Sequence, residues 1–207
     1  NKYVQSGNET KMNLYVLAFL TMAFYKACSK VIITEPKMRC ISVLLSVTSA
    51  CKFHCSHCYQ KLDMGKDVDI EILVDVVRKL DEMGVAFFNI EGGEPFLVFE
   101  RLKKVCSAVK VGEIWINSTG DGMTPDKLNT LKKMGVKGVM FSLHSANPEN
   151  INKFMGKADA WDKLTKGIEL CHAAGLDVAA NSCIMKEDFY NGTFQEIMKL
   201  AKRLGVS

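Results

Sequence analysis

Long hydrophobic runs are missing from this sequence, and their absence limits what the chain can be. The apolar stretch at residues 14–25, flanked by Lys11 and Lys26, contains only twelve residues. A helix needs about twenty apolar residues to span a bilayer, so this stretch is too short to cross a membrane. We expect it to form a helix that packs on the domain, with contact to a membrane surface as the alternative.

A block of charge of one sign is missing as well. The 27 Lys and Arg residues are scattered among 23 Asp and Glu residues, and the formal net charge of +4 is small. Nothing in this distribution indicates nucleic acid, and no DNA partner is expected. The sequence has no cleavable signal, and its eight cysteines lack paired spacing. We therefore predict free thiols in a reducing compartment, the cytoplasm.

A second Cys-x-x-Cys pair, which a structural zinc site would need, is also absent. What the chain has is Cys51, Cys55 and Cys58, directly after the apolar run 41–47 that predicts a buried strand. Thiolates this close repel one another unless a metal takes their charge. A 4Fe-4S cluster accepts three protein thiolates and can leave its fourth iron to a small molecule. We favour such a cluster, and zinc completed by a histidine of the loop is the alternative.

Strand and helix patterns alternate from Ile41 onward. Short apolar runs alternate with apolar positions at helical spacing, and glycines at the helix ends act as left-handed caps before strands. The predicted strands are 41–48, 85–90, 113–117, 138–142 and 177–181, and the predicted helices are 70–83, 102–109, 125–134, 148–174 in one or two pieces, and 194–204. This alternation predicts right-handed crossovers and a parallel α/β sheet with helices outside.

Polar residues follow the predicted strands. They lie in the cysteine loop and in the segments 92–95, 117–119, 142–145 and 181–182. Because the loops at the carboxyl ends of parallel strands converge on one mouth, the sequence predicts a single site built from five strand ends.

Two motifs occupy the first two of these strand ends. Cys-x-x-x-Cys-x-x-Cys follows the first strand, and Gly92-Gly93-Glu94-Pro95 follows the second. In this order they resemble the radical S-adenosylmethionine (radical SAM) enzymes. The resemblance covers residues 41–207 and implies a core domain with a partial parallel barrel of the (β/α)6 type, of which about five strands are present. Residues 1–40 are left as an N-terminal extension with the apolar helix. Because the chain does not begin with Met and stops where a sixth strand would start, we expect a portion of a longer protein.

The resemblance implies two cofactors, a 4Fe-4S cluster and S-adenosylmethionine (SAM). By it, Cys51, Cys55 and Cys58 bind three irons, and the fourth iron chelates the amino and carboxylate groups of SAM. Reductive cleavage would give methionine and a 5'-deoxyadenosyl radical that abstracts hydrogen from an unidentified substrate, a peptide or small molecule. The implied electron donor is a protein such as flavodoxin or ferredoxin. The alternative function, a non-catalytic iron-sulfur or zinc-binding protein, does not explain the Gly-Gly-Glu-Pro motif.

Three residues of the second motif and one of the loop carry cofactor roles by resemblance. Glu94 matches the partner of the amino group of SAM, and Gly92 and Gly93 allow the backbone to approach the ligand closely. His57 takes the aromatic position before the third cysteine, where the family packs a ring near adenine. Simple packing of the loop is the alternative for His57.

The later strand ends supply the remaining candidates. By resemblance, Ser142 and His144 match positions that face the ribose or the methionine carboxylate. Asn117, Thr119 and Asn181 are comparable candidates at the ends of the third and fifth strands. Ordinary capping of the strand end is the alternative for each of these residues.

Overall fold

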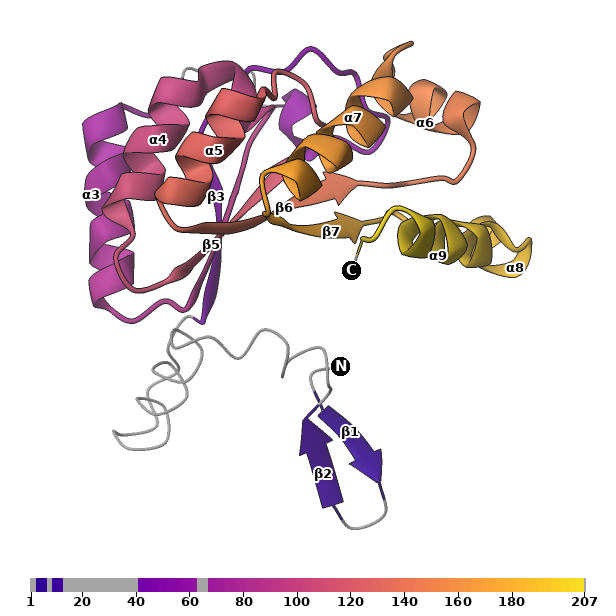
Figure 1. Cartoon of the computed structure of the whole chain (residues 1–207), viewed down its shortest axis with the longest axis horizontal. Coiled ribbons are helices and arrows are strands. Elements are labelled where there is room, and N and C mark those ends of the chain that lie inside the picture. The colour runs from indigo at the N-terminus through magenta and orange to yellow at the C-terminus, as the bar shows by residue number, and fades with distance from the viewer. Residues whose placement is uncertain (1–2, 7–8, 13–40, 63–66, 207) are drawn as a thin grey trace.

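The computed structural model describes residues 3–6, 9–12, 41–62 and 67–206 (Figure 1). The first two segments are the antiparallel strands β1 (Tyr3–Ser6) and β2 (Glu9–Met12), which the sequence does not predict. The predicted apolar helix at 14–25 lies outside the described residues. None of the helices in the described ranges combines the length and the apolar content that a bilayer crossing requires.

Five parallel strands form the sheet that carries the site. They lie in space in the order of the sequence: β3 (Ser42–Ser46), β4 (Phe87–Glu91), β5 (Glu113–Ser118), β6 (Val136–Ser142) and β7 (Asp177–Asn181). Every neighbouring pair is parallel. Each crossover therefore moves the chain one strand further in the same direction, as in a partial barrel. The α/β prediction with five parallel strands is confirmed.

Helices cover one face of this sheet (Figure 1). They are α3 (Ile70–Glu82), α4 (Phe99–Ala108), α5 (Pro125–Lys133) and α7 (Ala160–Ala173), with a short α6 (Pro148–Phe154) before α7. After β7 come α8 (Lys186–Tyr190), which the sequence does not predict, and α9 (Thr193–Arg203). The 3-10 turns η1 (Tyr59–Leu62) and η2 (Pro95–Val98) follow the two motifs. The predicted helix at 148–174 is therefore two helices.

Capping residues explain where the helices begin and end. The Thr124 hydroxyl accepts a hydrogen bond from the Lys127 N–H at 3.3 Å, so Thr124 caps α5, with proline at the first helical position. Gly84 and Gly135 follow α3 and α5 with φ of 88° and 89°. Only glycine adopts this left-handed conformation without strain, which is why these junctions turn the chain from helix to strand.

The strand register separates two faces of the sheet. Ile90 of β4 and Ile116 of β5 are partners, and both are fully buried on the face that packs against the helices. Successive residues of a strand point to opposite faces. The next rung, Ser46, Glu91 and Asn117, therefore lies on the face away from α3, α4, α5 and α7, here called the inward face.

Candidate active site

A pocket of about 890 Å³ opens at the carboxyl ends of the strands. Its lining comes from the cysteine loop and from the strand ends, as the parallel topology predicts. The predicted residues that line it are Cys51, Cys55, His57, Cys58, Gly92, Gly93, Asn117, Thr119, Ser142 and Asn181. Two predicted residues, Glu94 and His144, are not part of the lining.

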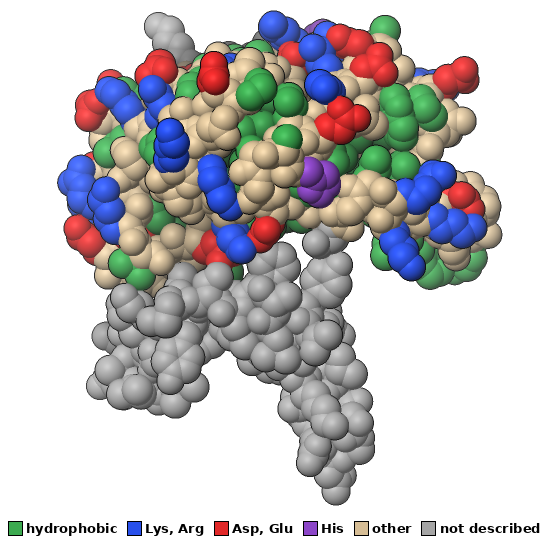
Figure 2. All heavy atoms as spheres, viewed as in Figure 1, with side chains coloured by type: hydrophobic (Ala, Val, Ile, Leu, Met, Phe, Trp, Pro, Cys, Tyr) green, Lys and Arg blue, Asp and Glu red, His purple; other side chains and the backbone are tan. Residues whose placement is uncertain are grey.

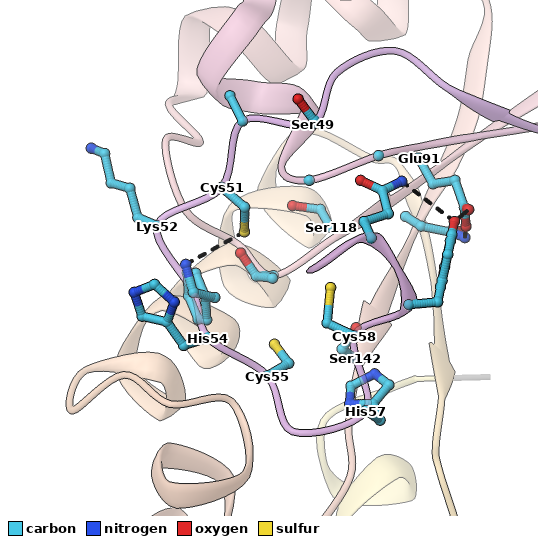
Figure 3. Close-up of a pocket in the computed structure, with 18 of the residues that line it drawn as sticks. Ser49, Cys51, Lys52, His54, Cys55, His57, Cys58, Glu91, Ser118 and Ser142 are labelled. Carbon is cyan, nitrogen blue, oxygen red and sulfur yellow. Dashed lines mark hydrogen bonds between the residues drawn. The ribbon is translucent and has the colours of Figure 1, made fainter. Parts of the chain in front are cut away.

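Figure 3 shows the sulfur atoms of Cys51, Cys55 and Cys58 pointing toward a common space. Burial raises the pKa of the Cys51 thiol, and the negative charge of Glu94 adds to this effect. The Phe53 N–H, which donates to Cys51 Sγ at 3.4 Å, opposes it. A thiol with a raised pKa is a weak nucleophile but becomes a ligand once a metal takes up the thiolate charge.

The six cysteines of the described part are free thiols. Cys106 and Cys171 are buried in the core, and burial raises the pKa of each to about 12. These two are structural. Within the described ranges, no three His, Cys, Asp or Glu side chains have the geometry to hold one metal ion. A cubane differs from such a site, because each of its protein thiolates binds a different iron.

The first half of the cysteine loop is held by the segment after α6. The His54 N–H donates to the Met155 carbonyl at 3.1 Å, and the Ser56 N–H donates to the Phe154 carbonyl at 2.9 Å. Gly156, with φ of 60°, passes so close that a Cβ there would lie 2.6 Å from the His54 carbonyl oxygen. Main-chain contacts therefore set the course of the loop between the first two cysteines.

The second half of the loop is held by side chains of the sheet. The Tyr59 hydroxyl donates to Glu91 Oε1, and Gln60 Nε2 donates to Ser46 Oγ at 3.0 Å. Asn117 Nδ2 donates to Glu91 Oε2 at 3.0 Å. The residues after Cys58 are thus joined to β3, β4 and β5 through one polar rung of the inward face.

The Gly-Gly-Glu-Pro turn packs against the chain just before the first cysteine. The Gly93 N–H donates to the Thr48 carbonyl at 2.7 Å, and the Glu94 N–H donates to the Ala50 carbonyl at 2.8 Å. A Cβ on Gly92 would lie 2.4 Å from the Thr48 oxygen, and one on Gly93 would lie 2.2 Å from the Ala50 oxygen. The glycines are therefore required for the close approach of the two motifs to each other, in addition to their place in the pocket wall.

The Glu94 carboxylate lies in the interior behind the pocket. It accepts from the Phe96 N–H (3.1 Å), Ser118 Oγ (2.8 Å), and the N–H and hydroxyl of Thr119 (2.8 and 2.6 Å). Burial raises the pKa of this carboxyl, and the four donated bonds oppose the rise. This placement differs from the expectation that the Glu94 side chain binds the amino group of SAM, because donors of its own chain take up the carboxylate. Its observed role is to join the ends of β4 and β5.

His144 is buried behind His57 instead of facing the pocket, which differs from its expected place beside the ribose. Its Nδ1 accepts from the Cys183 N–H at 3.1 Å, and burial lowers its pKa to about 4. The ring of His57 lies 4.6 Å from the ring of His144 and is stacked on Phe154 at 4.8 Å. His57 lines the pocket. A neutral His144 and Phe154 thus fix the orientation of the His57 ring at the pocket.

Sequence reasoning missed Tyr59, Gln60 and Glu91, which also line the pocket. A signal for Glu91 was present, because strand alternation places it on the face opposite the buried Ile90. Its contact with Tyr59 could not be foreseen, since the two residues are 32 positions apart.

The pocket, its three thiols and the adjoining glycine turn agree with a family match. Residues 45–201 match the family model of the Radical SAM superfamily. The chain belongs to the radical SAM superfamily. Members of this superfamily hold a 4Fe-4S cluster and SAM, and three thiols outside any disulfide that point into one pocket fit such a cluster.

Characterised proteins of two activities are similar to this radical SAM chain. The GTP 3',8-cyclase of Aquifex aeolicus (strain VF5) is 25% identical over 172 residues, which cover 79% of this chain and 53% of that protein. The PqqA peptide cyclase of Granulibacter bethesdensis is 24% identical over 178 residues, covering 84% of this chain and 46% of that protein. The chain thus spans about half the length of the curated relatives it matches.

Solved structures share the fold. Streptococcus suis SuiB superposes with a TM-score of 0.68 at 16% identity, covering 88% of this chain and 42% of that chain. SuiB also matches in its structures bound to S-adenosylmethionine and to its precursor peptide SuiA.

Proposed function

We propose that this chain is the cofactor-binding core of a radical SAM enzyme. Cys51, Cys55 and Cys58 would hold the 4Fe-4S cluster, and the adjoining pocket would hold SAM. When bound, these cofactors supply reductive cleavage of a carbon-sulfur bond and a 5'-deoxyadenosyl radical that abstracts hydrogen from the substrate. The observation that carries this function is that the three cysteines of the loop and the glycine turn line one pocket.

The chain's own residues then bind and orient SAM. We assign the His57 ring to the adenine and the polar side chains of Ser142 and Asn181 to the ribose hydroxyls and carboxylate, because all three line the pocket. We assign the amino group of SAM to main-chain groups of the glycine turn. Glu94 acts as a positioning residue behind them.

We infer a peptide substrate, since SuiB binds a precursor peptide and a PqqA peptide cyclase is among the relatives. A nucleotide is the second candidate, because the relatives include GTP 3',8-cyclases. The electron would come from a flavodoxin or ferredoxin. Free thiols at every described cysteine support a reducing location, the cytoplasm.

The test is anaerobic reconstitution with iron and sulfide, followed by absorption spectroscopy and assay of 5'-deoxyadenosine with dithionite and SAM. The wild type should bind about four irons and form 5'-deoxyadenosine, and Cys55→Ala should do neither. Cys106→Ala is the matched control, because the same atoms are removed from a core cysteine away from the pocket, and it should keep both properties. Cleavage of SAM by Cys55→Ala would contradict the proposed function, as would a wild type that holds only zinc.

A further inference from the structure

Glu91 is a carboxylate of the pocket wall whose charge has no cationic partner among the side chains of residues 41–60 and 67–206. It is the last residue of β4 and directly precedes Gly92. Its two oxygens accept from neutral donors, the Tyr59 hydroxyl and the Asn117 amide (Figure 3). None of the ion pairs among residues 41–60 and 67–206 includes it. A partly buried carboxylate without a cation is electrostatically unsatisfied, and a positively charged ligand group would stabilise it.

Two amide oxygens beside Glu91 also lack donors. Asn117 Oδ1 and Gln60 Oε1 are buried, and neither accepts a hydrogen bond from the part of the chain that the structure describes. The amide nitrogens of both residues are already committed, to Glu91 and to Ser46. Since buried polar atoms normally have partners, this wall offers acceptors to a ligand that carries hydrogen-bond donors.

Acidic residues also occur elsewhere on the inward face. Strand alternation and register give its positions as Ser42, Leu44, Ser46, Phe87, Asn89, Glu91, Glu113, Trp115, Asn117, Gly138, Met140, Ser142, Asp177, Ala179 and Asn181. Three of these fifteen residues are acidic and none is Lys or Arg, but Asp177 is paired at 2.6 Å with Lys137, the residue at the register shift of β6. Lys52 lines the pocket, but Figure 3 shows it extending away from the cysteine sulfurs. A polyphosphate would meet repulsion on this face, whereas a cation would be attracted.

We propose that Glu91 is a specificity-determining residue that binds an ammonium or guanidinium group of the substrate, with Asn117 Oδ1 and Gln60 Oε1 as further acceptors. This assignment rests on the proposed function, because it takes the part of the pocket that Glu91 lines as the place of the substrate, beside SAM in the same pocket. It names the substrate class as a peptide that presents a Lys or Arg side chain. A carboxylate with two amide oxygens matches the three N–H bonds of an ammonium group.

The test compares three variants of the full chain after reconstitution with iron, sulfide and SAM. Glu91→Gln removes the charge and keeps the shape. Tyr59→Phe removes the bond from the cysteine loop and keeps the charge. Glu100→Gln removes an exposed carboxylate that pairs with Lys103 and is the control for net charge. The probes are the peptide acetyl-Gly-Lys-Gly-amide and its uncharged norleucine analogue, and their dissociation constants are measured by NMR titration alongside the SAM affinity.

The wild type should bind the lysine peptide about tenfold more tightly than the norleucine peptide. Glu91→Gln should bring this ratio close to one, without changing the SAM affinity, while Tyr59→Phe and Glu100→Gln keep the wild-type ratio. Equal affinities in the wild type, or an unchanged ratio in Glu91→Gln, would overturn the assignment. A ratio that Tyr59→Phe abolishes equally would show that Glu91 acts only by holding the loop. A SAM affinity that falls in Glu91→Gln with the ratio intact would show that the cation is on SAM.

Failure of this assignment is separable from failure of the proposed function. A wild type that forms 5'-deoxyadenosine but shows no lysine preference overturns only the role of Glu91. A wild type that neither assembles the cluster nor cleaves SAM overturns both.

Discussion

The cysteine loop and the Gly-Gly-Glu-Pro turn follow neighbouring strands and meet at one pocket, yet they are held in opposite ways. The turn is fixed from inside, since Glu94 and Phe96 are fully buried and the Glu94 carboxylate accepts four hydrogen bonds. The loop has one core side chain, Phe53, and is otherwise held by main-chain bonds to residues 154–155 and by a few polar side chains. The difference indicates that folding alone positions the Gly-Gly-Glu-Pro turn. The cysteine loop would reach its final conformation only when the metal binds.

The largest effect on folding is expected from the turn. Glu94→Ala leaves the buried donors of Ser118 and Thr119 without an acceptor, and it should lower the free energy of unfolding by about 4 kcal/mol. Urea denaturation of the metal-free protein measures this change. Glu94→Gln, which keeps one acceptor oxygen, should lose less. A decrease in the free energy of unfolding below about 1 kcal/mol for Glu94→Ala would contradict the claim that the turn is held more firmly by folding than the cysteine loop.

A smaller loss of stability is expected from a change where the cysteine loop contacts the segment after α6. Gly156→Ala places a Cβ on a residue with left-handed φ and against the His54 carbonyl. It should lower the free energy of unfolding by about 2 kcal/mol and reduce iron incorporation. Gly175→Ala is the matched control, because φ is also positive (68°) but no atom lies within 4 Å of its added Cβ. Gly175→Ala should therefore lower the free energy of unfolding by less and leave iron incorporation unchanged. Equal losses of iron in the two variants would refute the contact with the loop.

The buried histidine behind the pocket should make stability depend on pH. The folded pKa of His144, about 4, is below its ordinary value of 6.5, so the unfolded chain takes up the proton first as the pH falls. The contribution of His144 to the free energy of unfolding is fully present above pH 6.5. It decreases toward pH 4 by at most about 1.4 kcal/mol per pH unit. In His144→Asn, whose amide oxygen can still accept from Cys183, the decrease between pH 6.5 and 5 should be smaller. Parallel pH curves for both proteins would contradict the buried neutral ring.

The smallest effect on folding is expected from a cysteine of the loop. Cys51→Ala should change the free energy of unfolding of the metal-free protein by less than about 0.5 kcal/mol while abolishing cluster assembly. Urea denaturation and iron analysis of the same preparation give the two values. A large loss of stability in the metal-free state would show that the loop, like the turn, is fixed by folding alone.

Much of this architecture could be predicted because the spacing of apolar residues along the sequence reflects the local secondary structure. Apolar alternation located the five strands, and the glycine junctions located the helix ends, of which Gly84 and Gly135 have the expected positive φ. The hairpin of β1 and β2 and the short helix α8 lacked such a pattern. The three cysteines were found because a ligand set with spacing 3 and 2 is visible in one dimension.

The roles of Glu94, His144 and Glu91 could not be predicted in the same way. A motif shows that Glu94 follows the glycines but not that Ser118 and Thr119 will supply its donors. His144 follows its strand by two residues, and only the packed structure shows that it turns behind His57. Contacts between residues far apart in sequence depend on register and packing, which sequence periodicity does not contain.

The most direct test of the central claim is electron paramagnetic resonance of the reconstituted wild type, reduced with dithionite, before and after SAM is added. A cluster with three cysteine ligands and one open iron predicts a reduced 4Fe-4S signal whose g values shift when SAM binds. A signal that SAM leaves unchanged, or a protein that holds zinc and gives no signal, would contradict it.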